Sequence, residues 1–140
     1  MNFLFFSVLE RYTLKLEVMS MNNVNKTLYI PLYAKAYVSQ KKIILDDPKA
    51  QEIWQTVKFP LKGKAKSKWL AYYMGMRSAV IDHWVNDQLE KYPVATVLHL
   101  GCGLDSRCLR VKSNQCWYDV DFESVIEERK NIMKKHSNII

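Results

Sequence analysis

The stretch Val97-Leu-His-Leu-Gly-Cys-Gly-Leu-Asp105 decides the fold class. It closes a short apolar run, Val94 to Leu100, that predicts a strand and ends in two glycines separated by one residue. Because glycine has no side chain, such a turn lets a ligand approach the backbone at the carboxyl end of the strand. A turn in which the glycines only satisfy strand-to-helix geometry is the alternative interpretation.

A second strand is predicted at Cys116 to Val120, followed by a helix from Glu123 to His136. That helix begins with acidic residues and ends with basic ones, as the helix dipole favours. The order strand, glycine turn, helix, strand, helix is typical of an α/β doubly wound sheet with parallel strands. Since a complete sheet needs more strands, we expect only its opening β-α units here.

The residues before this region predict helices. Apolar side chains recur at helical spacing in Leu28 to Gln40 and after Asp47-Pro48, an acidic cap followed by proline. The strongest helix signal runs from Ser67 to Tyr92, and the lysine-rich segment Lys58 to Lys68 predicts a solvated loop. We therefore expect three parts: an extension outside the fold (1–25), a helical cap (26–92) and the first two β-α units (93–140).

Composition limits the class of protein. The 140 residues are 49% hydrophobic and 25% charged, which fits one folded domain. The net charge of +7 permits nucleic-acid contact, but the lysine-rich loop has no interleaved aromatic residues, so we expect no nucleic-acid partner. No apolar run is long enough to span a membrane. The three cysteines fit no zinc spacing, which predicts reduced thiols, no metal and a cytoplasmic protein.

Asp121 stands at the end of the second predicted strand, eighteen residues after Gly103. An acidic side chain at this place accepts hydrogen bonds from the ribose hydroxyls of a nucleoside cofactor. A dinucleotide-dependent oxidoreductase fragment is one alternative function. Ser106 argues against it, because the nicotinamide fingerprint has its third glycine at that position.

Arg77 lies on the long predicted helix in a row whose other members are apolar: Trp69, Tyr73, Ile81 and Val85. We expect this row to face the core, where an arginine needs an anionic partner. The partner is either structural (Asp82, Asp105 or Asp121) or a ligand's carboxylate, which a guanidinium binds with two hydrogen bonds. A glycine turn, a ribose-binding acid and a carboxylate clamp together suit S-adenosylmethionine better than a dinucleotide.

These residues resemble a known family, the leucine carboxyl methyltransferases, and most closely its bacterial branch with O-methyltransferases of polyketide biosynthesis. The resemblance covers residues 26 to 135, and the most specific pieces are the Gly-Leu-Asp-Ser-Arg turn and the Tyr-Asp-Val-Asp strand end. The matching segments are Tyr29–Ala36, Asp47-Pro48, Arg77 with Asp82, Val97–Arg107, Trp117–Phe122 and Arg129-Lys130.

The resemblance implies a Rossmann-like class I methyltransferase fold that binds S-adenosyl-L-methionine and methylates an oxygen. By matching position, Arg77 would hold the methionine carboxylate, Gly101 and Gly103 would line the cofactor, and Asp121 would bind the ribose. Lys35 would also reach the cofactor carboxylate. The acceptor would be a carboxylate or hydroxyl of a small molecule or peptide. No catalytic base is evident in the sequence. This favours either a carboxylate acceptor, since that group is ionised at neutral pH, or a base in the half of the family's chain that is absent here.

Chains of this family are much longer, so the resemblance implies a truncated sheet. A non-catalytic remnant or interaction module is therefore a further alternative function. Exposed sheet edges readily pair with another chain, so we expect either a homodimer or poor solubility.

Overall fold

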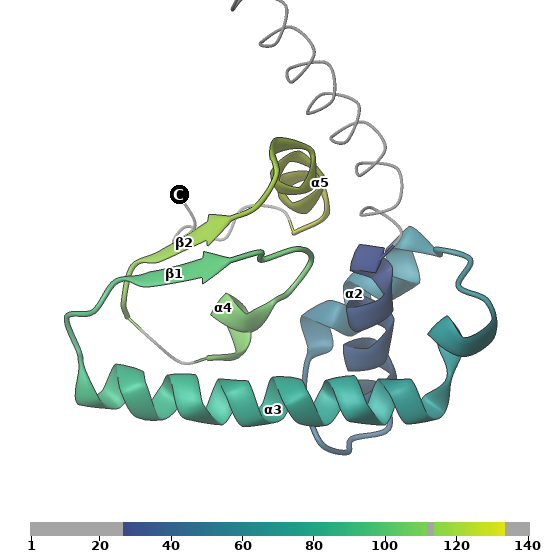
Figure 1. Cartoon of the computed structure of the whole chain (residues 1–140), viewed down its shortest axis with the longest axis horizontal. Coiled ribbons are helices and arrows are strands. Elements are labelled where there is room, and N and C mark those ends of the chain that lie inside the picture. The colour runs from purple at the N-terminus through teal and green to yellow at the C-terminus, as the bar shows by residue number, and fades with distance from the viewer. Residues whose placement is uncertain (1–26, 112–113, 134–140) are drawn as a thin grey trace, which may run out of the picture.

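The computed structural model describes residues 27–111 and 114–133 (Figure 1). The predicted extension (1–25) and the end of the predicted last helix at His136 lie outside these residues. In chain order the elements are a helix over residues 27–40, α2 (Pro48–Val57), the 3₁₀-helix η1 (Gly63–Lys66), α3 (Lys68–Lys91), β1 (Val97–Leu100), α4 (Arg107–Arg110), β2 (Trp117–Val120) and α5 (Glu123–Met133).

The two strands pair in parallel, with Val97 opposite Trp117 and Leu100 opposite Val120. This mixed structure with a small parallel sheet agrees with the expected α/β class. One sheet face packs inward through Trp117, while Leu98 and Leu100 on the other face are 61% and 71% exposed. Because the strands are parallel, the loop after β1 and the residues after β2 lie at the same end of the sheet.

Helix α2 begins as predicted. The Asp47 carboxylate accepts a hydrogen bond from the backbone N–H of Ala50 at 2.9 Å, and Pro48 opens the helix. Its buried residues, Ala50 and Ile53, join the largest core cluster. That cluster unites the 27–40 helix, α2, the loop after β1 and α5 through Tyr29, Leu32, Ala36, Ala50, Ile53, Leu104 and Met133.

Helix α3 runs along one edge of the molecule, with the sheet, α4 and α5 on one side of it (Figure 1). Its carboxyl-terminal part packs on the sheet, where Leu89 meets Val111 and Trp117. Its amino-terminal part packs on the 27–40 helix, where Ala71 contacts Tyr33 and Ala34. The long helix thus connects the 27–40 helix to the sheet.

The predicted inward face of α3 is wrong. Its large residues Trp69, Tyr73 and Trp84 are 71%, 61% and 61% exposed, and Arg77 lies on the exposed side as well. The buried side carries mostly small or polar residues: Ala71, Gly75, Ser78, Asp82 and Leu89. The cause is close packing, because a Cβ atom at Gly75 would lie only 2.9 Å from Val38, which leaves no room for an aromatic ring at this contact.

The lysine-rich segment is solvent-exposed as predicted, although it contains η1, which the sequence did not indicate. All three cysteines, Cys102, Cys108 and Cys116, are free thiols. Within residues 27–111 and 114–133, no helix combines the length and apolarity required to cross a membrane.

Candidate functional site

A cavity of about 590 Å³ lies where the 27–40 helix, α3 and the carboxyl end of β1 meet. Four of the predicted site residues line it: Lys35, Arg77, Gly101 and Gly103. They come from three separate segments of the chain. Ligands of parallel α/β sheets bind at this end of the strands, so the cavity is the candidate functional site.

The glycine turn forms one wall of the cavity. Gly101 and Gly103 have φ angles of +65° and +50°, a conformation that favours glycine. A Cβ atom on Gly101 would meet nothing within 4 Å, so a ligand can approach this stretch of backbone closely. A Cβ atom on Gly103 would lie 3.0 Å from Leu28, so Gly103 also serves the packing of the turn.

Asp121 does not line the cavity but is bonded directly to its glycine wall. Its Oδ2 accepts from the backbone N–H of Gly103 at 2.8 Å, and its Oδ1 accepts from the backbone N–H of Phe122 at 2.8 Å. An ionised carboxylate has about four acceptor positions, so each oxygen keeps capacity for a further donor. The side chain is half-buried at the strand end.

Arg77 lines the cavity from the exposed side of α3. Among the described residues it makes no ion pair or hydrogen bond, so none of the three expected carboxylates, Asp82, Asp105 and Asp121, is its partner. Asp82 instead accepts from Arg107 and Arg110, each at 2.7 Å, and Asp121 accepts from backbone N–H groups. The guanidinium of Arg77 is therefore available to an anionic ligand.

Lys35 is buried and already paired with Asp105, whose Oδ1 lies 2.6 Å from its Nζ. Arg107 and Arg110 also contact the Asp105 carboxylate, at 3.2 and 3.1 Å. Burial raises the pKa of Asp105, but the charges of Lys35, Arg110 and Arg107 together outweigh it and hold that pKa well below its usual range. Three cationic side chains, Lys35, Arg77 and Arg107, line the cavity, against one carboxylate, Asp105.

A buried polar network connects the cap to the glycine turn. Asp47 is fully buried and accepts from the Ser106 hydroxyl at 2.7 Å and from the Arg110 guanidinium. Arg110 also donates to Asp82 on α3. The network ties α2, α3 and α4 together through groups that are all partnered, which makes the wall of the cavity rigid.

Arg129 is a residue that the sequence reasoning did not single out as functional. It is 3% exposed on α5, between the buried residues Val125 and Met133. It donates to the carbonyls of Gly103 and Asp105 at 3.1 and 2.6 Å and forms an ion pair with Asp119. The signal was present: an arginine in an apolar helical row. An arginine in such a row needs an anionic partner, and Arg129 has one in Asp119.

His99 faces the cavity from β1 and is fixed by Asp119. Its Nδ1 lies 2.9 Å from an Asp119 oxygen, and because an ionised carboxylate only accepts, Nδ1 carries the proton. Burial raises the pKa of Asp119, whereas the hydrogen bond from His99 and the charge of Arg129 lower it, with a net lowering.

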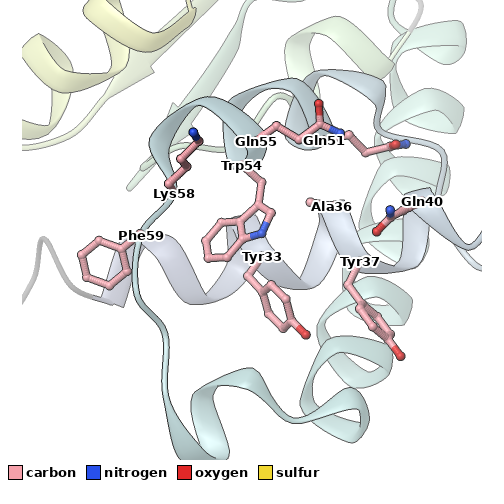
Figure 2. Close-up of a pocket in the computed structure, with 9 residues that line it drawn as sticks. All are labelled: Tyr33, Ala36, Tyr37, Gln40, Gln51, Trp54, Gln55, Lys58 and Phe59. Carbon is pink, nitrogen blue, oxygen red and sulfur yellow. The ribbon is translucent and has the colours of Figure 1, made fainter.

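A second cavity, of about 390 Å³, lies between the 27–40 helix and α2 (Figure 2). Aromatic rings line it, and those of Tyr33 and Trp54 are 5.1 Å apart between centroids. None of the predicted site residues is among its lining residues. Within the described part of the chain, no three His, Cys, Asp or Glu side chains gather in a way that would hold a metal ion.

Residues 20–140 match the family described as leucine carboxyl methyltransferase. The chain belongs to the leucine carboxyl methyltransferase family. This confirms the resemblance seen in the glycine turn and the strand ends.

Two curated relatives of the chain carry methyltransferase names. The tetracenomycin polyketide synthesis O-methyltransferase TcmP of Streptomyces glaucescens is 32% identical over 119 residues, which are 83% of this chain and 44% of that protein. The S-adenosyl-L-methionine-dependent methyltransferase dpfgK of Gibberella zeae is 28% identical over an alignment of 126 residues, and the match covers 81% of this chain and 42% of that protein. The chain therefore spans less than half the length of these relatives. No solved structure matches it.

The structure also gives a role to the segment that carries the family resemblance most specifically. Ser106 bonds to Asp47, and Arg107 donates to Asp82 at 2.7 Å. Asp105 lies between Lys35, Arg107 and Arg110. All three side chains brace the turn, while Asp105 and Arg107 also line the cavity.

Proposed function

We propose that this chain forms the S-adenosyl-L-methionine-binding part of an O-methyltransferase with a Rossmann-like class I fold. The observation that carries the proposal is the convergence of Arg77, Lys35 and the glycine turn on one cavity. The family assignment and the names of both relatives support the same reaction class.

Each part of the cavity suits one part of this cofactor. Arg77 has a free guanidinium, which binds the methionine carboxylate, and Lys35, paired with Asp105, lines the same cavity. The bare backbone at Gly101 accommodates the nucleoside end. Asp121, held beside the turn by Gly103, accepts from the ribose hydroxyls with its unused lone pairs.

The cofactor supplies a sulfonium-bound methyl group, and the protein's task is alignment of the acceptor oxygen and exclusion of water. We propose a carboxylate or hydroxyl oxygen of a small molecule or peptide as the acceptor. A carboxylate needs no base, and we assign no catalytic residue in these 140 residues.

We further propose that the helical part (26–92) caps the site and that the β-α units (93–140) hold the cofactor. The free thiols suit a cytoplasmic protein.

A dinucleotide-dependent oxidoreductase is the rival, and Ser106 speaks against it. At the position of the third glycine of the dinucleotide fingerprint, the Ser106 side chain is fully buried and bonded to Asp47. Because this side chain fills the space where helix and strand would pack through a bare glycine, the turn does not fit that fingerprint.

Isothermal titration of the full chain tests the proposal. We expect S-adenosylhomocysteine to bind at a single site and NAD neither to bind nor to displace it. Heat with NAD at the same site would favour the oxidoreductase. Absence of heat with S-adenosylhomocysteine, in a preparation whose circular dichroism shows folded helices, would favour a non-catalytic module.

A further inference from the structure

An apolar stripe runs along the outer side of α3. Its members, Trp69, Tyr73, Met76, Val80 and Trp84, are 71%, 61%, 50%, 69% and 61% exposed. They recur every three or four residues, opposite the buried side of the helix that carries Ala71, Gly75, Ser78 and Asp82. In Figure 1 this helix borders the molecule, with the other labelled elements on one side. Single exposed apolar residues are ordinary, but a continuous stripe marks a contact surface.

The side chains of the stripe are arranged so that two copies of α3 can pack on each other in antiparallel orientation. If a second copy of α3 lies antiparallel and the two-fold axis passes between Met76 and Arg77, Trp69 faces Trp84 of the second copy. Tyr73 then faces Val80 of the second copy, so a ring packs on a branched side chain. In the same register Met76 faces Arg77 of the second copy beside the axis, and Trp69 packs on Trp84 at each end. Arg77 lies on the helix between the stripe and the buried side, so its guanidinium still reaches the cavity that it lines.

The charges at the two ends of α3 favour the same direction. Exposed lysines precede and open the helix at Lys64, Lys66 and Lys68, whereas exposed Asp87 and Glu90 lie in its last turns, next to Lys91. In the antiparallel arrangement the lysine-rich start of α3 lies near Asp87 and Glu90 of the second copy. A parallel arrangement would bring the lysine-rich ends together, which costs free energy by repulsion.

The size of the surface suits a dimer. Trp69 and Trp84 lie about 22 Å apart along the helix, and the five exposed side chains offer about 600 Å² per copy. The charged ends bring the contact close to the ~800 Å² per partner of a stable interface. We propose that the α3 stripe is the interface of an antiparallel homodimer. This dimer uses α3 and not the sheet edges, and it leaves the buried side of α3 unchanged.

Cysteine cross-linking of the full chain tests the geometry. In a Cys116→Ser background, which removes the exposed native thiol, Met76→Cys should form a disulfide-linked dimer under mild oxidation, because its two copies lie beside the axis. Trp69→Cys alone should not, since its two copies are about 22 Å apart. A mixture of Trp69→Cys and Trp84→Cys should cross-link. Cross-linking of Trp69→Cys alone, or none in the Met76→Cys variant, would overturn the proposal.

Sedimentation equilibrium provides the second test. The wild-type chain should be dimeric at micromolar concentration, and Trp84→Glu should weaken association at least 10-fold with an unchanged circular dichroism spectrum. Val94→Glu is the matched control, because Val94 is 96% exposed outside the stripe, and it should remain dimeric. A monomeric wild type, as would follow if residues 1–26 covered the stripe, or a Trp84→Glu variant that stays fully dimeric, would contradict the interface.

Discussion

The backbone N–H of Gly103 donates to Oδ2 of Asp121 at 2.8 Å. This bond joins the turn after β1 to the end of β2, two features that the sequence separates by eighteen residues. The second Asp121 oxygen is held by the N–H of Phe122. The carboxylate is thus oriented without a ligand, and preorganisation of this kind lowers the entropic cost of binding.

Gly101→Ala should weaken S-adenosylhomocysteine binding at least 10-fold, because a methyl group would project into open space that the ligand needs. The positive φ of Gly101 also costs about 1 kcal/mol of folding free energy in the variant. Gly63→Ala is the matched control: Gly63 has a similar φ of +59° with nothing within 4 Å, but it lies in η1 away from the cavity. Calorimetry should show that both variants lose about the same stability, whereas only Gly101→Ala binds S-adenosylhomocysteine more weakly. Equal binding by both variants would remove Gly101 from the site.

Asp47→Ala should lower the free energy of unfolding by about 3 kcal/mol, because it removes a helix cap and leaves Ser106 and part of Arg110 buried without an acceptor. Urea denaturation measures the change. The neighbouring Asp46 is exposed, so Asp46→Ala should stay within about 0.5 kcal/mol of wild type. Similar midpoints for the two variants would show that the buried network contributes little.

Stability should fall as the solution becomes acidic, and Asp105 should cause part of this fall. Its pKa is held below the value of an unfolded aspartate, about 3.9. The unfolded state therefore binds more protons, so the stabilisation is complete above about pH 5 and decreases as pH drops below about 4. Asp105→Asn should be less stable than wild type at pH 7 and lose less between pH 5 and pH 3. Parallel urea midpoints for both proteins over that range would contradict this role.

Local features of the structure could be predicted from the sequence. The cap at Asp47-Pro48, the strands at Val97 and Trp117 and the glycine turn all follow from neighbouring residues, whose conformational preferences act over a few positions. The convergence of Lys35 and Gly101 on one cavity followed only from the family resemblance, because these residues are far apart in the chain.

The orientation of α3 could not be predicted from hydrophobic periodicity. Its apolar row and its small-residue row both have helical spacing, so either could face the core. The small-residue row does so because Val38 packs closely against Gly75. The expected inward position of Arg77 is therefore wrong, although its side chain lines the cavity from the exposed side of the helix. The contacts of Asp47 with Arg110, and of Arg129 with the turn, depend on tertiary packing that no local pattern contains.

The central claim is that Arg77 binds a cofactor carboxylate, and a ligand comparison tests it most directly. Calorimetry would measure S-adenosylhomocysteine and 5′-methylthioadenosine, which lacks the amino-acid carboxylate, against wild type, Arg77→Ala and Lys91→Ala, an exposed cation on the same helix outside the cavity. We predict that Arg77→Ala weakens S-adenosylhomocysteine binding 10- to 100-fold, a loss of about 1.5 to 3 kcal/mol. It should leave methylthioadenosine binding unchanged, and Lys91→Ala should change neither. An Arg77→Ala variant that binds S-adenosylhomocysteine as tightly as wild type, or loses both ligands equally, would contradict the account.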